Sequence, residues 1–418
     1  MLAAETNVDD PGIDDPGIVD GRGAADPARP ADLSERLPAL DALRGLALLG
    51  VLAINLEGEF RVSIFRQFLP GPPEAGLDRW IDAVLLTFVD MKAFALFPLL
   101  FGVGLAIQVE RGAGRPRRTV LLLRRLLVLL GFGLVHLVLI WNGDILTAYA
   151  VAGLAVLPLL FGPTWLMGAA CAACLAVFAL QSLLPPLLPP IVAFPDRAWL
   201  VRQVADADRV YATGGFFEIL DFRIREIAGF LPLHAFVLPR TLGLFLLGAL
   251  AWRAGLVRRA ARFAAGLWGF AALAAGTGVV LTLATAARSY SGWPSLGRFE
   301  AVGASVGTIL LALGYAAAIL AAGTTRTGRR GLAWAEPVGR MAFTNYIVQS
   351  LVLGVVFYGY GLGLFGRLGL TAGLGIVLAL YAVQVVGSRL WLRRFRHGPL
   401  EWLWRVLAYG RALPLRRA

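Results

Sequence analysis

Ten long apolar segments, separated mostly by short loops, constrain this chain more than any other feature. A helix needs about 20 mostly apolar residues to cross the hydrocarbon core of a bilayer. Such segments lie at residues 38–56, 92–109, 119–141, 145–161, 164–184, 229–252, 264–287, 301–322, 339–358 and 369–388. The sequence therefore predicts an all-α, polytopic transmembrane helix bundle of about ten spans, with residues 78–91 as a helical lead-in to the second span.

The composition leads to the same class. Of all residues, 58% are hydrophobic and only 16% are charged, whereas soluble domains carry about 25% charged residues. The net charge of +12 is also typical of nucleic-acid-binding proteins. However, the arginines fall in short loops between apolar segments, as the orientation of a membrane protein requires. The lipid bilayer is therefore an expected partner, and nucleic acid is not.

The arginines also orient the bundle. If the N-terminus is inside, the inner segments hold 23 arginines and the outer segments hold 11. Short loops count most in this rule, and most of the outer arginines lie in the two long loops. Both termini are therefore predicted to be cytoplasmic.

Regions outside the spans divide the chain further. Residues 1–35 are acidic, contain the tandem repeat DDPGIDDPGI and are predicted to be a disordered cytoplasmic tail. Residues 36–418 are predicted to form a single transmembrane domain, with an outer loop at 185–228 and a basic cytoplasmic segment at 389–418. The outer loop mixes charged and aromatic residues at helical spacing, which fits either an interfacial helix or a lid over a site.

Span one carries Asp41, Arg44 and Asn55 within its apolar sequence. At about 100° per residue, Asn55 returns to within about 20° of Arg44 around the helix, and Asp41 lies about 60° away. The three side chains therefore share one stripe, with Asp41 and Arg44 near the cytoplasmic end. An Asp41–Arg44 pair that anchors the helix at the interface is one interpretation. It does not explain the amide on the same stripe.

Span three repeats this arrangement with Arg125 and His136, and Asp144 follows in the turn WNGDIL. An ionisable group inside a bilayer is costly and by default marks function. Asp144 is expected to cap the next helix, to orient His136, or to do both. A core histidine that bonds a backbone carbonyl is the structural alternative for His136.

Span nine and the start of span two add further polar candidates. Arg340 lies at the cytoplasmic start of span nine, and Asn345 and Gln349 share one face of it at i, i+4 spacing. Lys92, Asn345 and Gln349 are candidates for substrate binding. The alternatives are an interfacial anchor for the lysine and interhelical hydrogen bonds for the amides. No metal site is expected, because the two cysteines lie in an apolar span without partner ligands.

These residues form two predicted layers. The inner layer consists of Asp41, Arg44, Arg125 and Arg340. The outer layer consists of Asn55, His136 and Asp144. The inner layer suits a cytoplasmic, phosphate-rich cofactor through charge-assisted hydrogen bonds, and the outer layer suits a base that works near neutral pH. The stripe on span one is predicted to line a passage between the two layers.

Six stretches, in order, resemble the YeiB-like family of bacterial membrane proteins. They are LDALRGLALLGVLAIN, FPLLFGVGLAIQ, GLVHLVLIWNGDILTAYAVAGL, GRMAFTNYIVQS, FYGYGLGLFG and GPLEWLWRVLAYGRALPLR. The first stretch also resembles a wider group of transmembrane acyltransferases, which includes heparan-α-glucosaminide N-acetyltransferase. That resemblance implies a multi-pass protein of the bacterial cytoplasmic membrane that takes an acyl group from cytoplasmic acyl-CoA and places it on an acceptor at the far face.

One departure from the wider group matters. The catalytic histidine of heparan-α-glucosaminide N-acetyltransferase lies shortly after the first of these spans, on the far side of the membrane. Here no histidine occurs between Asn55 and His136, so that role would move to His136.

The resulting hypothesis is an integral membrane acyltransferase with acetyl-CoA as the expected donor. The acyl-CoA phosphates would bind the inner layer. His136, oriented by Asp144, would deprotonate a hydroxyl or amine of a small-molecule or cell-envelope acceptor, and Asn55 would donate to the oxyanion. The rival hypothesis is a proton-coupled transporter or exporter of a small amphipathic molecule, with His136 and Asp144 as a proton relay. A homodimer is compatible with either hypothesis.

Overall fold

Helices form wherever the sequence carries long apolar runs. The structure, a computed structural model, describes residues 37–69, 75–114, 117–181, 183, 194–291 and 298–417. The acidic tail predicted at residues 1–35 lies outside the described residues. The α-helices are α1 (Pro38–Asn55), α2 (Gly76–Phe88), α3 (Lys92–Arg111), α4 (Arg118–Val135), α5 (Leu146–Val156), α6 (Thr164–Leu180), α7 (Arg197–Thr213), α8 (Phe216–Arg253), α9 (Ala264–Ser291), α10 (Arg298–Ala322), α11 (Arg326–Leu332), α12 (Glu336–Arg340), α13 (Ala342–Phe357), α14 (Leu370–Arg394) and α15 (Pro399–Tyr409).

The predicted all-α membrane bundle is confirmed. Among the described residues, seven helical segments are long and apolar enough to cross a membrane: those at 38–58, 76–111, 118–140, 216–253, 260–284, 300–322 and 370–394. Three further predicted spans fall on α5, α6 and α13, which are apolar but shorter. An isolated bridge joins Phe395 and Arg416, and no strand occurs in the described ranges.

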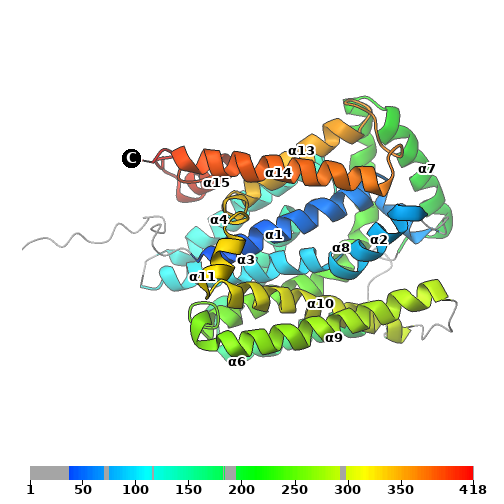
Figure 1. Ribbon diagram of the computed structural model, residues 1–418. Coiled ribbons are helices and arrows are strands. Elements are labelled where there is room, and N and C mark those ends of the chain that lie inside the picture. The colour runs from blue at the N-terminus through cyan, green and yellow to red at the C-terminus, as the bar shows by residue number, and fades with distance from the viewer. Residues whose placement is uncertain are drawn as a thin grey trace, which may run out of the picture. The chain divides into compact units, whose positions relative to one another are not determined.

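The helices lie in layers around a central pair (Figure 1). α3 packs along α8, and α1 and α5 pack against this pair. α9 and α10 pack against each other on one side, where α10 also contacts α3. α13 and α14 lie on the opposite side, and α15 packs against α4 and α13.

The segment expected as the outer loop is largely helical. α7 occupies residues 197–213, and α8 already begins at Phe216, so that residues 216–228 belong to a helix rather than a loop. α8 has 38 residues and a length of about 57 Å, which exceeds the roughly 30 Å of hydrocarbon. α8 is therefore longer than one crossing needs, and its first turns lie against α7, where Glu218 pairs with Arg209 and Glu226 accepts a hydrogen bond from Tyr211.

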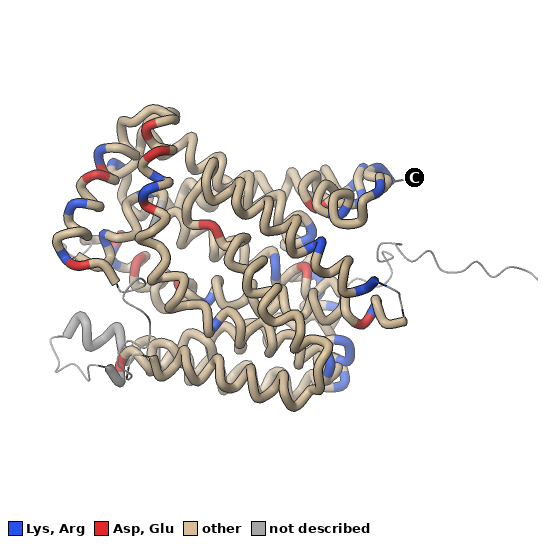
Figure 2. The backbone as a smooth tube through the Cα atoms, turned by 180° about the vertical axis from the view of Figure 1, so that it is seen from behind, with Lys and Arg blue, Asp and Glu red and all other residues tan. Residues whose placement is uncertain are grey.

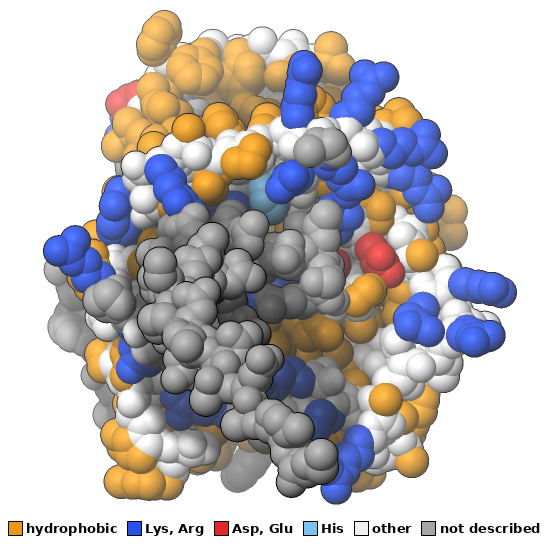
Figure 3. All heavy atoms as spheres, turned by 90° about the vertical axis from the view of Figure 1, so that its left-hand side faces the viewer, with side chains coloured by type: hydrophobic (Ala, Val, Ile, Leu, Met, Phe, Trp, Pro, Cys, Tyr) orange, Lys and Arg blue, Asp and Glu red, His pale blue; other side chains and the backbone are white. Residues whose placement is uncertain are grey.

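Charged residues are concentrated at the two ends of the bundle and are sparser between them (Figure 2). The end that carries α11 and α15 shows a broad ring of basic side chains (Figure 3). Arg326, Arg329 and Arg330 of α11 and Arg393 and Arg394 of α14 are exposed there. This end is the one predicted to face the cytoplasm.

Two glycines allow α1 and α12 to touch through their backbones. A Cβ on Gly45 would collide with the carbonyl group of Ala335, and a Cβ on Gly339 would collide with that of Asp41. Small residues at such positions are how helices pack closely in a membrane. The contact brings the start of span nine against the polar end of α1.

We predict that Gly339→Leu destabilises the protein, because overpacking of a close contact costs about 1–3 kcal/mol. The thermal midpoint in detergent should fall by several degrees. Gly331→Leu is the matched control, since a Cβ at Gly331 in the neighbouring α11 meets open space. Equal loss in both variants would show that the α1–α12 contact has no special role.

The predicted orientation can be tested by cysteine labelling after Cys171 and Cys174 are replaced by alanine. Arg202→Cys on α7 should react with a membrane-impermeant maleimide in intact cells, because Arg202 is exposed at the predicted outer end. Arg393→Cys should react only after the membrane is permeabilised. The reverse pattern would invert the orientation.

Candidate functional site

Asp144, His136 and Ser350 form a buried chain of hydrogen bonds. The Nδ1 atom of His136 lies 2.9 Å from Oδ1 of Asp144, and its Nε2 atom lies 3.0 Å from the hydroxyl oxygen of Ser350. All three residues are at most 2% exposed. The structure therefore brings the predicted pair His136 and Asp144 together and adds a hydroxyl that sequence reasoning missed.

The local fold explains the pairing of His136 with Asp144. α4 ends at Val135 and continues as a π-helical turn over His136–Ile140, a feature frequent at functional sites. Asp144 then accepts hydrogen bonds from the backbone N–H groups of Leu146 (3.1 Å) and Thr147 (2.6 Å) at the start of α5. Asp144 is therefore both a helix cap and the partner of His136, the two roles that the sequence suggested.

Close packing holds the hairpin of α4 and α5 together. A Cβ on Gly133 would collide with the backbone and side chain of Thr147, so that only glycine permits this approach. The ring centre of Tyr346, on α13, lies 5.1 Å from that of the His136 imidazole, and the ring centre of Trp141 lies 6.1 Å from that of the imidazole. The imidazole is thereby fixed in one orientation.

This arrangement defines the chemistry that His136 can perform. When Nδ1 carries the proton and donates it to the Asp144 carboxylate, Nε2 is free to accept the hydroxyl proton of Ser350. A carboxylate, an imidazole and a hydroxyl in this order are the components of an activated nucleophile. The Ser350 hydroxyl also lies 3.3 Å from the carbonyl oxygen of Tyr346, one turn earlier.

Asn55, the third predicted catalytic residue, is buried at the end of α1. The helix changes there to a π-helical turn over Leu56–Phe60, as α4 does at His136. The Oδ1 atom of Asn55 has no hydrogen-bond partner among the described residues. No hydrogen bond in the described part of the chain joins it to His136.

The inner layer divides into two groups. Asp41 and Arg44 form an ion pair of 2.9 Å, as in the anchoring interpretation. The α1–α12 contact also brings Arg340 and Glu336, which the sequence analysis did not single out, close to this pair. Burial and the Asp41 carboxylate raise the pKa of the Glu336 carboxyl, and Arg340 opposes the shift. This group has two arginines and two carboxyl groups, so its charges balance.

Arg125 belongs to a separate group on α4 and α15. Its guanidinium lies 4.5 Å from the centre of the Trp404 ring, and the Trp404 indole donates to its carbonyl oxygen at 2.9 Å. Burial and the nearby guanidinium groups of Arg125 and Arg111 lower the pKa of Arg405 to about 10. Tyr409 and Glu401 partly offset the repulsion between these guanidinium groups, and a bound anion would relieve the rest.

Comparisons with known proteins define the family. The chain is 32% identical over 408 residues to the "Uncharacterized protein YxaH" of Bacillus subtilis, with 91% of this chain and 96% of that protein covered. It is 31% identical over 405 residues to the "Uncharacterized protein YeiB" of Escherichia coli, with 91% and 98% covered.

A 28% identical relative, the "Uncharacterized 39.9 kDa protein in amylase 3'region" of Bacillus acidopullulyticus, covers 92% of this chain. The family model "Protein of unknown function (DUF418)" matches residues 251–411, which include Ser350. The chain belongs to the YeiB-like family. No solved structure matches it.

In this YeiB-like protein, the three candidates for substrate binding all have internal partners. The Lys92 ammonium group is buried and donates to the carbonyl of Leu86 at 2.6 Å. Asn345 donates to Ser388 at 2.9 Å. Gln349 donates to Gln384 at 2.8 Å. Both amides therefore join α13 to α14, as their structural alternative predicted.

Sequence reasoning also missed two buried arginines on α8. Arg240 is 3% exposed, lies over the ring of Phe178 and has Asp90 as a charged neighbour. Its position inside an apolar span was a signal that could have found it. Arg223 is 1% exposed, and its guanidinium lies over the ring of Tyr358. It falls in residues 185–228, for which the sequence predicts an outer loop, so no buried position was expected there.

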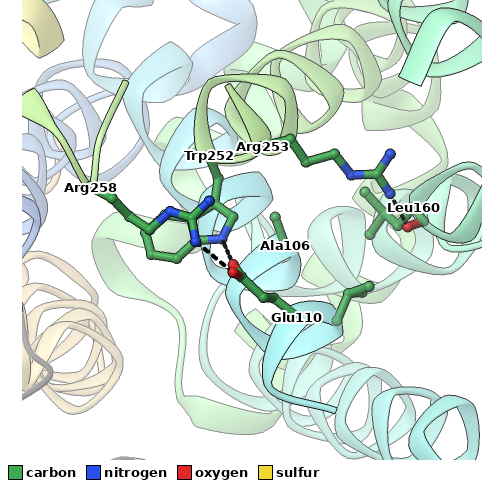
Figure 4. A pocket seen from close by; sticks show the side chains of 7 residues that line it. Ala106, Glu110, Leu160, Trp252, Arg253 and Arg258 are labelled. Atoms are coloured by element: carbon green, nitrogen blue, oxygen red, sulfur yellow. Dashed lines mark hydrogen bonds and ion pairs between the residues drawn. The ribbon is translucent and has the colours of Figure 1, made fainter. Parts of the chain in front are cut away.

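A cavity of about 230 Å³ lies elsewhere, where α3 and α8 end. Glu110 accepts hydrogen bonds there from the Trp252 indole and the Arg258 guanidinium, both at 2.5 Å, while Arg253 points to the carbonyl of Leu160 (Figure 4). None of the predicted site residues lines this cavity.

Glu401 connects α15 to the site helix α13. Its carboxyl group accepts hydrogen bonds from the backbone N–H groups of Phe343 (2.8 Å) and Thr344 (3.1 Å) and contacts the Thr344 hydroxyl at 2.5 Å. Burial raises the pKa of this carboxyl, although the hydrogen bonds oppose the shift. Glu401 thus caps α13 from outside that helix.

We predict that Glu401→Ala lowers stability by about 1–2 kcal/mol, the usual cost of a lost helix cap. Glu401→Gln should retain most of it, because the amide oxygen can still accept from the two N–H groups. Thermal unfolding in detergent measures both. Asp221→Ala, which removes a carboxylate from an exposed ion pair, is the control and should change little. An unaltered midpoint in Glu401→Ala would contradict the capping role.

Proposed function

We propose that this protein is an acyltransferase of the bacterial cytoplasmic membrane. It would move an acyl group from cytoplasmic acyl-CoA, with acetyl-CoA as the expected donor, to a hydroxyl or amine acceptor at the outer face. The observation that carries the proposal is the imidazole of His136, held between the Asp144 carboxylate at 2.9 Å and a hydroxyl at 3.0 Å. An acyl transfer to a hydroxyl needs a base in this arrangement.

The acceptor chemistry follows from His136. Its Nε2 atom faces a hydroxyl group, so it is placed to take a proton from an alcohol or amine that attacks a thioester. Asp144 keeps the proton on Nδ1 and stabilises the imidazolium that forms. The site is removed from water, which strengthens these interactions and limits loss of the acyl group by hydrolysis.

The donor chemistry is supported by the arginines at the other end of α4. Arg125 lies 11 residues before His136, which places it about 16 Å closer to the cytoplasmic end on nearly the same helix face. Arg405 has both Arg125 and Arg111 as charged neighbours. Phosphate groups bound there would leave the flexible arm of the donor to reach along α4 towards His136. Asp41, Arg44 and Arg340 are less suited to this role, because Glu336 adds a second carboxyl group that balances the two arginines.

A proton-coupled transporter is the second candidate. The observation in its favour is the group of buried Lys92 and Arg240 with half-buried Asp90, whose charges no acyl-transfer step uses. Ionisable residues at this depth commonly line substrate or proton pathways. A transporter would bind acyl-CoA only adventitiously and release no CoA thiol.

We predict that the protein in lipid nanodiscs binds acetyl-CoA, as measured by calorimetry. Arg125→Gln and Arg405→Gln should each weaken the affinity roughly tenfold, because each removes a charge-assisted contact. His136→Gln should bind as the parent protein does but release no CoA thiol.

Arg393→Gln is the matched control, since Arg393 is exposed on α14 at the same end of the bundle. It should bind acetyl-CoA normally. If the parent protein binds neither acetyl-CoA nor longer acyl-CoA esters, the acyltransferase proposal is wrong and the transporter becomes the leading candidate.

A further inference from the structure

We propose that Ser350 is a catalytic nucleophile that carries the acyl group as an ester between donor and acceptor. This inference rests on the proposed acyltransferase function and adds a covalent intermediate to it. The acceptor would then react with acyl-Ser350 and not with the acyl-CoA itself.

The geometry favours Ser350 as a nucleophile over a purely structural role for its hydroxyl. Ser350 supplies the hydroxyl that contacts Nε2 of His136, and the opposite ring nitrogen contacts a carboxylate. The serine is 2% exposed, so its hydroxyl has the imidazole and the Tyr346 carbonyl as polar neighbours. If an external acceptor reacted directly, it would have to displace Ser350 from Nε2 first.

The reaction then proceeds in two balanced steps. In the first, Oγ of Ser350 attacks the thioester carbonyl carbon, a C–O bond forms and the C–S bond breaks. The hydroxyl proton passes to Nε2 of His136 and then to the departing sulfur, which leaves as free CoA thiol. In the second, the acceptor loses its proton to Nε2 and attacks the ester, and Oγ of Ser350 leaves with that proton.

The position of Ser350 explains why a two-step route suits this fold. Ser350 lies in the middle of α13, which has 16 residues and a length of about 24 Å. An acyl group on Ser350 is therefore about 12 Å from either end of the helix. Donor and acceptor need not occupy the site together, so one can enter from the cytoplasmic side and the other from the outer side.

The test uses the full-length protein in nanodiscs and two probes. With acetyl-CoA labelled in its acetyl group and no acceptor added, the label should remain on the protein after denaturation and map to Ser350 by mass spectrometry. A fluorophosphonate, which reacts with activated serines, should label the same residue. Both labels should be lost in Ser350→Ala and reduced at least tenfold in His136→Gln.

Two further variants guard against simple misfolding. Ser388→Ala removes an equally buried serine that bonds Asn345 on α13, whereas the ring nitrogens of His136 bond Asp144 and Ser350, and it should label normally. Ser350→Cys should retain an acyl label, now as a thioester that neutral hydroxylamine cleaves, whereas the serine ester requires alkaline hydroxylamine. A change of cleavage chemistry at one residue has no explanation in a purely structural role.

The outcomes separate this inference from the proposed function. Steady release of CoA thiol by a folded Ser350→Ala variant would overturn the nucleophile and leave the acyltransferase intact. Fluorophosphonate labelling of Ser350 without any acyl label or CoA release would overturn the acyltransferase and retain an activated serine. Absence of both labels in the parent protein would overturn the inference.

Discussion

A carboxylate that is removed from water inside an apolar bundle must find donors, and Asp144 finds three. Two are the N–H groups at the start of α5, and the third is the Nδ1 atom of His136. Because these contacts come from α4 and α5 together, they fix the turn between the helices as well as the imidazole. The remaining ring nitrogen is thereby directed at Ser350 on α13.

The position of α13 depends in turn on hydrogen bonds with two neighbouring helices, α15 and α14. Glu401 holds its first residues from α15, and amide hydrogen bonds from Asn345 and Gln349 join it to α14. The basic groups on α15 and the hydroxyl on α13 thus belong to one connected structure. Binding of an anion near Arg405 and chemistry at His136 would act on elements that are already linked.

How much of this the sequence predicted depends on the kind of signal. Apolar length predicted the helices, because hydrocarbon leaves a backbone few other options. The tight turn WNGDIL after span three predicted that Asp144 caps the next helix and lies close enough to orient His136, and both features are present. Arg125 and Arg44 were placed in one inner layer because both lie near the cytoplasmic ends of their spans; in the structure Arg44 pairs with Asp41, whereas Arg125 packs against Trp404 of α15. A position along one helix does not show which neighbouring helix packs on it. The sequence did not single out Ser350 as a site residue, because serine is common in membrane helices, where its hydroxyl usually bonds a carbonyl one turn back.

The most direct test of the central claim is the rate of CoA thiol release by Asp144→Asn in nanodiscs. Asparagine caps helices about as well as aspartate, so the variant should keep its thermal midpoint. With the asparagine's amide oxygen on the short cap to Thr147, however, its NH2 group faces Nδ1 of His136, so Nδ1 loses the acceptor for its proton. The account predicts a loss of rate of roughly 10³–10⁴-fold, as in other sites of this type. A stable variant that releases CoA thiol at the parent rate would show that Asp144 only caps α5, and the account of His136 as an oriented base would be wrong.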